Sequence, residues 1–92
     1  MDLGLAGKHA LVTGSTAGIG YAIARGLATE GASVIVTGRT KATVDAALPR
    51  LRQAAPDAHV TGIVADCATA AGAKAVFAEV PELDILVNNL GI

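Results

Sequence analysis

Four short apolar runs constrain the fold of this chain more than any other feature. Each run is rich in Leu or β-branched residues and mostly lacks alternating polar positions, and the runs span residues 9–13, 33–37, 60–65 and 84–87. Such runs are typical of strands that are buried on both faces, which is the usual condition of a parallel sheet. We therefore expect four parallel strands with cover on both sides.

Helical stretches separate the four runs. Their apolar residues recur at helical spacing, and they cover residues 19–30, the segment that follows Thr40, and residues 70–78. Gly31 offers a C-terminal stop for the first stretch. Pro49 lies inside the second stretch. Because proline removes an amide donor and clashes with the preceding turn, we predict a kink or a split near Leu48.

The alternation of strands and helices predicts an α/β fold with a Rossmann-like, doubly wound parallel sheet. We expect right-handed crossovers and the strand order 3-2-1-4. With 92 residues the chain fits a single domain. Ligands of such sheets bind beyond the carboxyl ends of the strands, so the residues that end each strand are the candidates for a site.

Composition excludes several classes of partner. The formal net charge is −1 and the isoelectric point is near 6.0, so we expect no basic field for nucleic acid or an anionic membrane. No apolar stretch approaches the roughly 18 residues that span a bilayer. Cys67 is the single cysteine, and no zinc-ligand spacing accompanies it. These features predict a cytoplasmic protein without a metal site.

Three glycines stand where the first strand turns into the first helix. Gly14, Gly18 and Gly20 leave the backbone without Cβ atoms, so a pyrophosphate can approach the amides and the dipole of the helix N-terminus. A P-loop is disfavoured, because no Gly-Lys-Ser/Thr follows. The spacing also differs from G-x-G-x-x-G. The alternative is a glycine-rich connection that binds nothing.

Arg39 follows the second strand, where a fold that prefers NAD places Asp or Glu for the ribose hydroxyls. A guanidinium there suits an adenosine 2′-phosphate, and one charge-assisted hydrogen bond gives roughly 10- to 100-fold discrimination. The position therefore favours NADP(H), with NAD(H) still possible. The alternative is a solvated surface arginine.

Polar residues also end the third and fourth strands. Asp66 is placed to accept the exocyclic amine of an adenine, or else caps a turn. Cys67 is expected to be a small wall of the adenine pocket. Asn88 and Asn89 can tie neighbouring strand ends together and contact a ribose, and the alternative there is a plain loop.

These motifs together resemble the short-chain dehydrogenase/reductase family over essentially the whole chain. The resemblance is carried by Thr13-Gly14-x-x-x-Gly18-Ile19-Gly20, by Asp66 and by Asn88-Asn89-x-Gly91. It implies a set of residues that contact the cofactor, namely Gly14, Ser15, Thr16, Gly18, Ile19, Gly20, Arg39, Asp66, Cys67, Asn89 and Gly91. Within this set the glycine turn would hold the phosphates and ribose, Arg39 the 2′-phosphate, and Asp66 and Cys67 the adenine. Leu90 departs from the alanine usual in the family.

The resemblance also implies an activity. Members similar to this chain include 3-oxoacyl reductases, so we expect hydride transfer between NADP(H) and a small carbonyl or alcohol substrate, by an enzyme that is a homo-oligomer when complete. The family's Ser and Tyr-x-x-x-Lys lie downstream of the Asn-Asn-x-Gly motif, where this sequence stops, and the single tyrosine, Tyr21, has Arg25 rather than Lys four residues later. We therefore expect residues 1–92 to be the inactive N-terminal part of a dinucleotide-binding domain. The alternatives are a non-catalytic NADP(H)-binding sensor or interaction module, and a structural fragment without a ligand.

Overall fold

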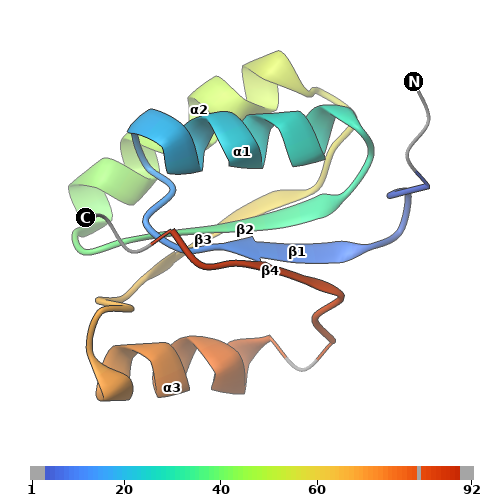
Figure 1. Ribbon diagram of the computed structural model, residues 1–92. Coiled ribbons are helices and arrows are strands. Elements are labelled where there is room, and N and C mark those ends of the chain that lie inside the picture. The colour runs from blue at the N-terminus through green and yellow to red at the C-terminus, as the bar shows by residue number, and fades with distance from the viewer. Residues whose placement is uncertain (1–3, 81, 90–92) are drawn as a thin grey trace.

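Four strands and three helices alternate along the chain. A computed structural model describes residues 4–80 and 82–89. The elements are β1 (His9–Val12), α1 (Gly18–Thr29), β2 (Ser33–Gly38), α2 (Lys41–Ala54), β3 (Val60–Val64), α3 (Ala70–Glu79) and β4 (Ile85–Val87). All strand pairs are parallel and the sheet order is β3-β2-β1-β4, which confirms the predicted topology. Figure 1 shows α1 and α2 on one face of the sheet and α3 on the other.

The core is divided by the sheet into two unequal parts. Alternate residues of β1 face opposite sides, so Ala10 and Val12 join the cluster that α1 and α2 cover, whereas Leu11 faces α3. The α1 and α2 side contains most of the buried apolar residues, including Ala24, Val34, Val36, Leu51 and Val60. On the α3 side, Leu11 is buried with Val76 and Val80. One helix therefore covers much less of the sheet than two.

The prediction that all four strands are buried on both faces is wrong for β3 and β4. In β3, Thr61, Gly62 and Val64 are exposed, and in β4 the Leu86 side chain is exposed. Both strands lie at edges of the described sheet, so each has one strand neighbour. An edge strand loses the cover that a central strand receives from helices on both sides. The apolar sequence of these strands alone did not distinguish edges from the centre.

Pro49 does not split α2. The helix runs without interruption from Lys41 to Ala54 with the proline inside it. Pro49 is exposed at the outer side of the helix, while Val44, Ala47 and Leu51 are buried before and after it. Packing of this apolar side on the sheet offsets the roughly 3 kcal/mol that an interior proline costs. The split is therefore wrong, because tertiary packing overrides the local preference, whereas the alternative of a kink stays a prediction.

Gly31 ends α1 as predicted. Its φ of +98° lies in a region that favours glycine, and its amide donates to the Ala28 carbonyl at 3.1 Å. The amide of Ala32 donates to the Leu27 carbonyl, also at 3.1 Å, which closes the helix end and starts the chain toward β2. Within the described residues, none of the helices is both long and apolar enough to cross a membrane.

An apolar surface remains on the α3 side of the sheet. Phe77 is 46% exposed and Leu86 is 49% exposed. Both side chains line a hollow of about 310 Å³ between α3, β1 and β4, together with Leu11, Val76 and others. Exposed apolar surface beside an open strand edge promotes association.

We predict that the 92-residue chain alone self-associates through this surface. Replacing Phe77 and Leu86 by Glu should weaken association by at least about tenfold, since burying either side chain contributes about 1.5 to 3 kcal/mol. Size-exclusion chromatography over a range of concentrations measures this effect. Ile19→Glu is the control, because Ile19 is 73% exposed but lies at the start of α1. A parent chain that stays monomeric at every concentration and melts cooperatively would contradict the prediction.

Candidate functional site

The turn between β1 and α1 requires glycine at two positions where φ is positive. Gly14 has a φ of +57° and Gly18 a φ of +62°. A Cβ on Gly14 would lie 2.5 Å from the backbone oxygen of Asn89, so the turn and the end of β4 approach more closely than a side chain allows. A Cβ on Gly20 would meet the Gly14 carbonyl oxygen and the Asn89 side-chain amide. The first helix turn therefore packs directly on the glycine turn.

Ser15 lies beneath this turn and is fully buried. Its hydroxyl donates to the Val12 carbonyl at 2.6 Å and accepts the Thr37 amide at 2.9 Å. The Ser15 amide donates to the Thr37 carbonyl at 3.0 Å. The structure thus places Ser15 in the connection between the ends of β1 and β2, below the surface that a ligand would reach.

Thr13 and the Asn88-Asn89 pair join β1 to β4. The Asn89 amide donates to the Thr13 hydroxyl oxygen at 2.9 Å, and the Asn89 side-chain nitrogen donates to the Gly14 carbonyl at 3.2 Å. The Thr13 hydroxyl can donate to the Asn88 side-chain oxygen at 3.3 Å. The prediction that these asparagines tie neighbouring strand ends together is confirmed.

A pocket of about 420 Å³ lies at the carboxyl ends of β1, β2 and β3. Its lining comes from the glycine turn after β1, from the ends of β2 and β3 and from the residue beyond β4. It comprises Gly14, Thr16, Ala17, Thr37, Gly38, Arg39, Ala65, Asp66, Cys67, Ala68 and Asn89. Six predicted residues are therefore brought together in one place: Gly14, Thr16, Arg39, Asp66, Cys67 and Asn89.

The other predicted residues are placed differently. Gly18 and Ile19 are exposed at the first turn of α1, beside the pocket lining. Gly20 and Ser15 are buried under the turn. Gly91 and the unusual Leu90 lie outside the described residues.

The N-terminus of α1 differs from those of the other two described helices. Thr40 caps α2 by accepting from the Thr43 amide, and Thr69 caps α3 by accepting from the Gly72 amide. At α1 the cap residue is Ala17, and no side chain bonds the first amides. Amides at such an end carry a partial positive charge and bind anions well. The uncapped start of α1 therefore offers amide donors next to the glycine turn, and that an anion binds there stays a prediction.

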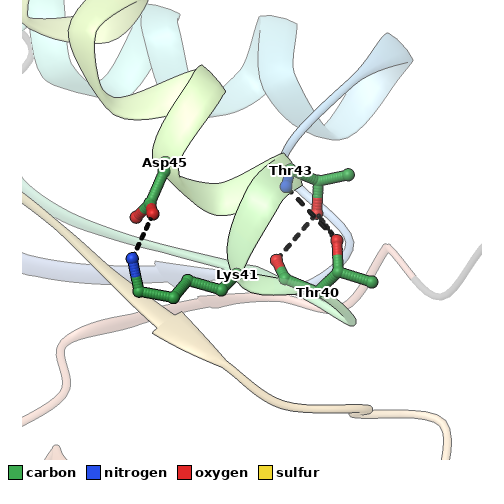
Figure 2. A network of polar contacts seen from close by, with 4 residues as sticks. All are labelled: Thr40, Lys41, Thr43 and Asp45. Carbon is green, nitrogen blue, oxygen red and sulfur yellow. Dashed lines mark hydrogen bonds and ion pairs between the residues drawn. The ribbon is translucent and has the colours of Figure 1, made fainter.

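Arg39 stands at the rim of the pocket and is exposed. Directly after it, Thr40 caps α2 and Lys41 donates to the Asp45 carboxylate at 2.5 Å, as Figure 2 shows. That hydrogen bond and the charge of Asp45 raise the pKa of Lys41. The ion pair of Lys41 is the one formed among the described residues, so no carboxylate in that part of the chain neutralises Arg39.

Asp66 has one of its two predicted roles in the structure and a place suited to the other. One carboxylate oxygen accepts the Ala68 amide at 3.0 Å, and the Asp66 carbonyl accepts the Thr69 amide at 3.1 Å, so the residue shapes the turn before α3. The same residue lines the pocket. Cys67 is half-buried in the pocket wall, with its thiol 3.6 Å from the Thr37 hydroxyl. The turn role of Asp66 is therefore shown, and its contact with an adenine stays a prediction.

Sequence reasoning assigned no role to Thr37 or Gly38. The buried Thr37 hydroxyl accepts from the Gly14 amide at 3.2 Å, which fixes the start of the turn. A Cβ on Gly38 would come within 2.6 Å of the Thr16 methyl group, so glycine lets the loop pack on the end of β2. The sequence feature that could have indicated both residues was their position at the end of a strand, beside Arg39.

Among the described residues, no three His, Cys, Asp or Glu side chains gather as a metal site would require.

Comparison with known proteins decides the family. A family model described as short chain dehydrogenase matches residues 8–92. The chain belongs to the short-chain dehydrogenase family. Its similarity covers only the first part of the longer family members, since the chain spans about a third of the length of the relatives it matches.

Individual relatives support this membership in the family. The oxidoreductase YvaG of Bacillus subtilis is 49% identical over 92 residues, which is 100% of this chain and 35% of the relative. The L-sorbose reductase of Gluconobacter frateurii, solved with NADPH and L-sorbose, is 40% identical with a TM-score of 0.92, over 100% of this chain and 36% of that one. A 3-oxoacyl (acyl-carrier-protein) reductase of Agrobacterium tumefaciens, solved with NADP bound, is 34% identical with a TM-score of 0.84, over 96% and 34%.

We predict that Ser15→Ala lowers the free energy of unfolding by about 1 to 3 kcal/mol, because it leaves the buried Thr37 amide without its acceptor. Thr29→Ala is the matched control: its exposed hydroxyl bonds only the Gly26 carbonyl of its own helix, so the loss there should stay below about 0.5 kcal/mol. Urea unfolding followed by circular dichroism measures both. Equal losses in the two variants would show that the Ser15 hydroxyl does not hold the strand ends together.

Proposed function

We propose that this chain is the NADP(H)-binding portion of a short-chain oxidoreductase that transfers hydride between NADP(H) and a small carbonyl or alcohol substrate. The observation that carries the proposal is the pocket itself, which combines the uncapped start of α1 with an unneutralised Arg39 at the rim. A dinucleotide needs an anion site for its pyrophosphate, and NADP(H) needs a second one for its 2′-phosphate.

The residues present fit such a cofactor. The glycine turn and the first amides of α1 would bind the pyrophosphate, and Gly18 would leave room for its approach, since a Cβ there meets nothing within 4 Å. Asp66 and Cys67 would bound the adenine, and Asn89 would contact the ribose, as all three line the pocket. When bound, the nicotinamide supplies or accepts the hydride. The chain's own residues would fix the position of the cofactor by these contacts.

Arg39 would select the phosphorylated cofactor. Its guanidinium presents a planar set of donors that matches a phosphate group. Asp66 is the one acidic residue of the described pocket lining, and it comes from the turn after β3 and not from the end of β2. A site that prefers NAD would be expected to place a carboxylate at the end of β2. Related structures solved with NADPH or NADP are consistent with this preference.

We predict that Arg39→Asp shifts the ratio of the dissociation constants for NADPH and NADH by about 10- to 100-fold toward NADH, because one or two charge-assisted bonds are lost. Titration of each cofactor by fluorescence measures the ratio. Lys74→Asp makes the same change of charge on α3, across the sheet, and should leave the ratio unaltered. If the ratio in Arg39→Asp equals that of the parent, Arg39 does not contact the 2′-phosphate.

The alternative is a non-catalytic NADP(H)-binding module, which would need the pocket but no proton donor. Tyr21 is the single tyrosine and has Arg25, not Lys, four residues later. Its ring packs against the core on the α1 side, and the Arg50 guanidinium lies over it at 4.4 Å from the ring centre. It therefore lies away from the pocket lining. No proton donor for a carbonyl oxygen is identified among the described residues.

A chimera separates the two functions. We predict that residues 1–92, grafted in place of the matching part of the L-sorbose reductase, yield a protein that reduces L-sorbose with NADPH, whereas the 92 residues alone give no turnover. Oxidation of NADPH is followed by its absorbance, with the ungrafted reductase as the reference. A chimera that folds and binds NADPH but gives no turnover would favour the non-catalytic module, and one that folds without binding NADPH would contradict both.

A further inference from the structure

A second hollow, of about 300 Å³, lies between α1 and α2. Its lining consists of Tyr21, Arg25, Arg50, Gln53 and Ala54. It shares no residue with the pocket at the strand ends. Both helices lie on the face of the sheet opposite to α3, as Figure 1 shows, so this hollow is also separate from the apolar surface around Phe77.

The two arginines approach the hollow from different helices. Arg25 lies one helical turn after Tyr21 on α1, so the two side chains are neighbours on the same side of that helix. Arg50 comes from α2, and its guanidinium lies 4.4 Å from the centre of the Tyr21 ring. The same ring also packs against the core. The ring therefore holds Arg50 in place through a cation–π contact.

Among the described residues, no carboxylate forms an ion pair with either arginine. None of the five lining residues is acidic, and neither arginine takes part in the ion pair formed among the described residues. The guanidinium of a third arginine, Arg52, donates to the Val60 carbonyl at 3.2 Å. The two helices together carry Arg25, Lys41, Arg50 and Arg52 against Asp45.

The positive charge of these two helices contrasts with the net charge of −1 of the whole chain. Glu30 follows α1 and Asp57 follows α2, but neither lines the hollow, whose lining carries two permanent positive charges. Guanidinium groups present several donors in a plane, and they form their strongest hydrogen bonds with phosphate or carboxylate oxygens. Gln53 and Tyr21 also line the hollow, and both residue types carry a side-chain hydrogen-bond donor.

We propose that this hollow binds the phosphate group of a small molecule, at a site distinct from the cofactor pocket. Two guanidinium groups match the two negative charges of a phosphate monoester better than the single charge of a carboxylate. Arg50 is oriented before binding by the Tyr21 ring, and Arg25 completes the site from the facing helix. The proposal does not depend on the identity of the cofactor.

The chain provides its own reporter for this site. Tyr21 is the only tyrosine and the sequence contains no tryptophan, so the emission of the full chain comes from one ring that lines this hollow. We predict that inorganic phosphate changes this emission in a saturable way, and that acetate at equal ionic strength binds at least about tenfold more weakly. Arg25→Ala and Arg50→Ala should each weaken phosphate binding by about 10- to 100-fold, which is the effect of one charge-assisted hydrogen bond.

Two control variants separate binding in this hollow from a general effect of charge and from binding in the cofactor pocket. Lys74→Ala removes one positive charge from α3 and should leave phosphate binding unchanged. Arg39→Ala alters the cofactor pocket and should also leave the fluorescence response unchanged. Circular dichroism verifies that each variant keeps its helices. Arg25→Ala keeps the test valid if Arg50→Ala does not fold, because Arg50 is the arginine stacked on the core-packed ring.

Three results would overturn the proposal. The first is a response to phosphate that persists undiminished in Arg25→Ala. The second is a response that is lost in Arg39→Ala, which would assign the phosphate to the cofactor pocket. The third is a response that sodium chloride reproduces at the same ionic strength, which would reduce the effect to screening of charge.

Discussion

The buried hydroxyl of Ser15 is the interaction on which the rest of the site depends. It connects the Val12 carbonyl and the Thr37 amide at the point where the two central strands end. Hydrogen bonds in such a buried place are costly to leave unmade, so the strand ends have one favourable relative position. The Thr37 hydroxyl then fixes the Gly14 amide. The position of the glycine turn is thus set by the buried hydrogen bonds of Ser15 and Thr37 beneath it.

Bonds to β4 extend this framework across the sheet. Thr13 binds the amide of Asn89, and Asn89 in turn binds the Gly14 carbonyl. Three strands therefore contribute to one rigid edge, and the pocket lies on that edge. Under the proposed function, such a site would position a dinucleotide through backbone groups, and the Arg39 side chain would distinguish NADP(H) from NAD(H).

Much of the fold could be predicted because it follows from local patterns. The apolar runs and helical spacings are properties of neighbouring residues, and they gave the order of elements and, with the crossover rules, the order of strands. The uninterrupted α2 could not be predicted in this way, because the packing of Leu51 beyond Pro49 depends on the sheet. The burial of Ser15 likewise depends on Thr37, which is distant in the sequence. The exposure of Leu86 depends on the position of β4 at an edge of the described sheet.

The site residues divide in the same way into those that local sequence patterns indicate and those that depend on long-range contacts. Gly14, Arg39 and Asp66 were found because each follows a strand, and the topology brings strand ends together. Thr37 was missed because a buried threonine in an apolar run looks like an ordinary core residue. The hollow between α1 and α2 was also missed, since no local signal relates Tyr21 to Arg50. Contacts between helices become visible only when the helices are placed on the sheet.

The approach of Gly14 to Asn89 also matters for how this fold can be recombined. The two residues are 75 positions apart, yet their backbones are so close that a Cβ on Gly14 would lie 2.5 Å from the Asn89 oxygen. Neither segment has room to adjust to a partner of different shape. If two related proteins were recombined at a point between β1 and β4, Gly14 would come from one parent and Asn89 from the other, and the two segments would not be matched to each other. A recombination point after Asn89 would transfer both residues from the same parent.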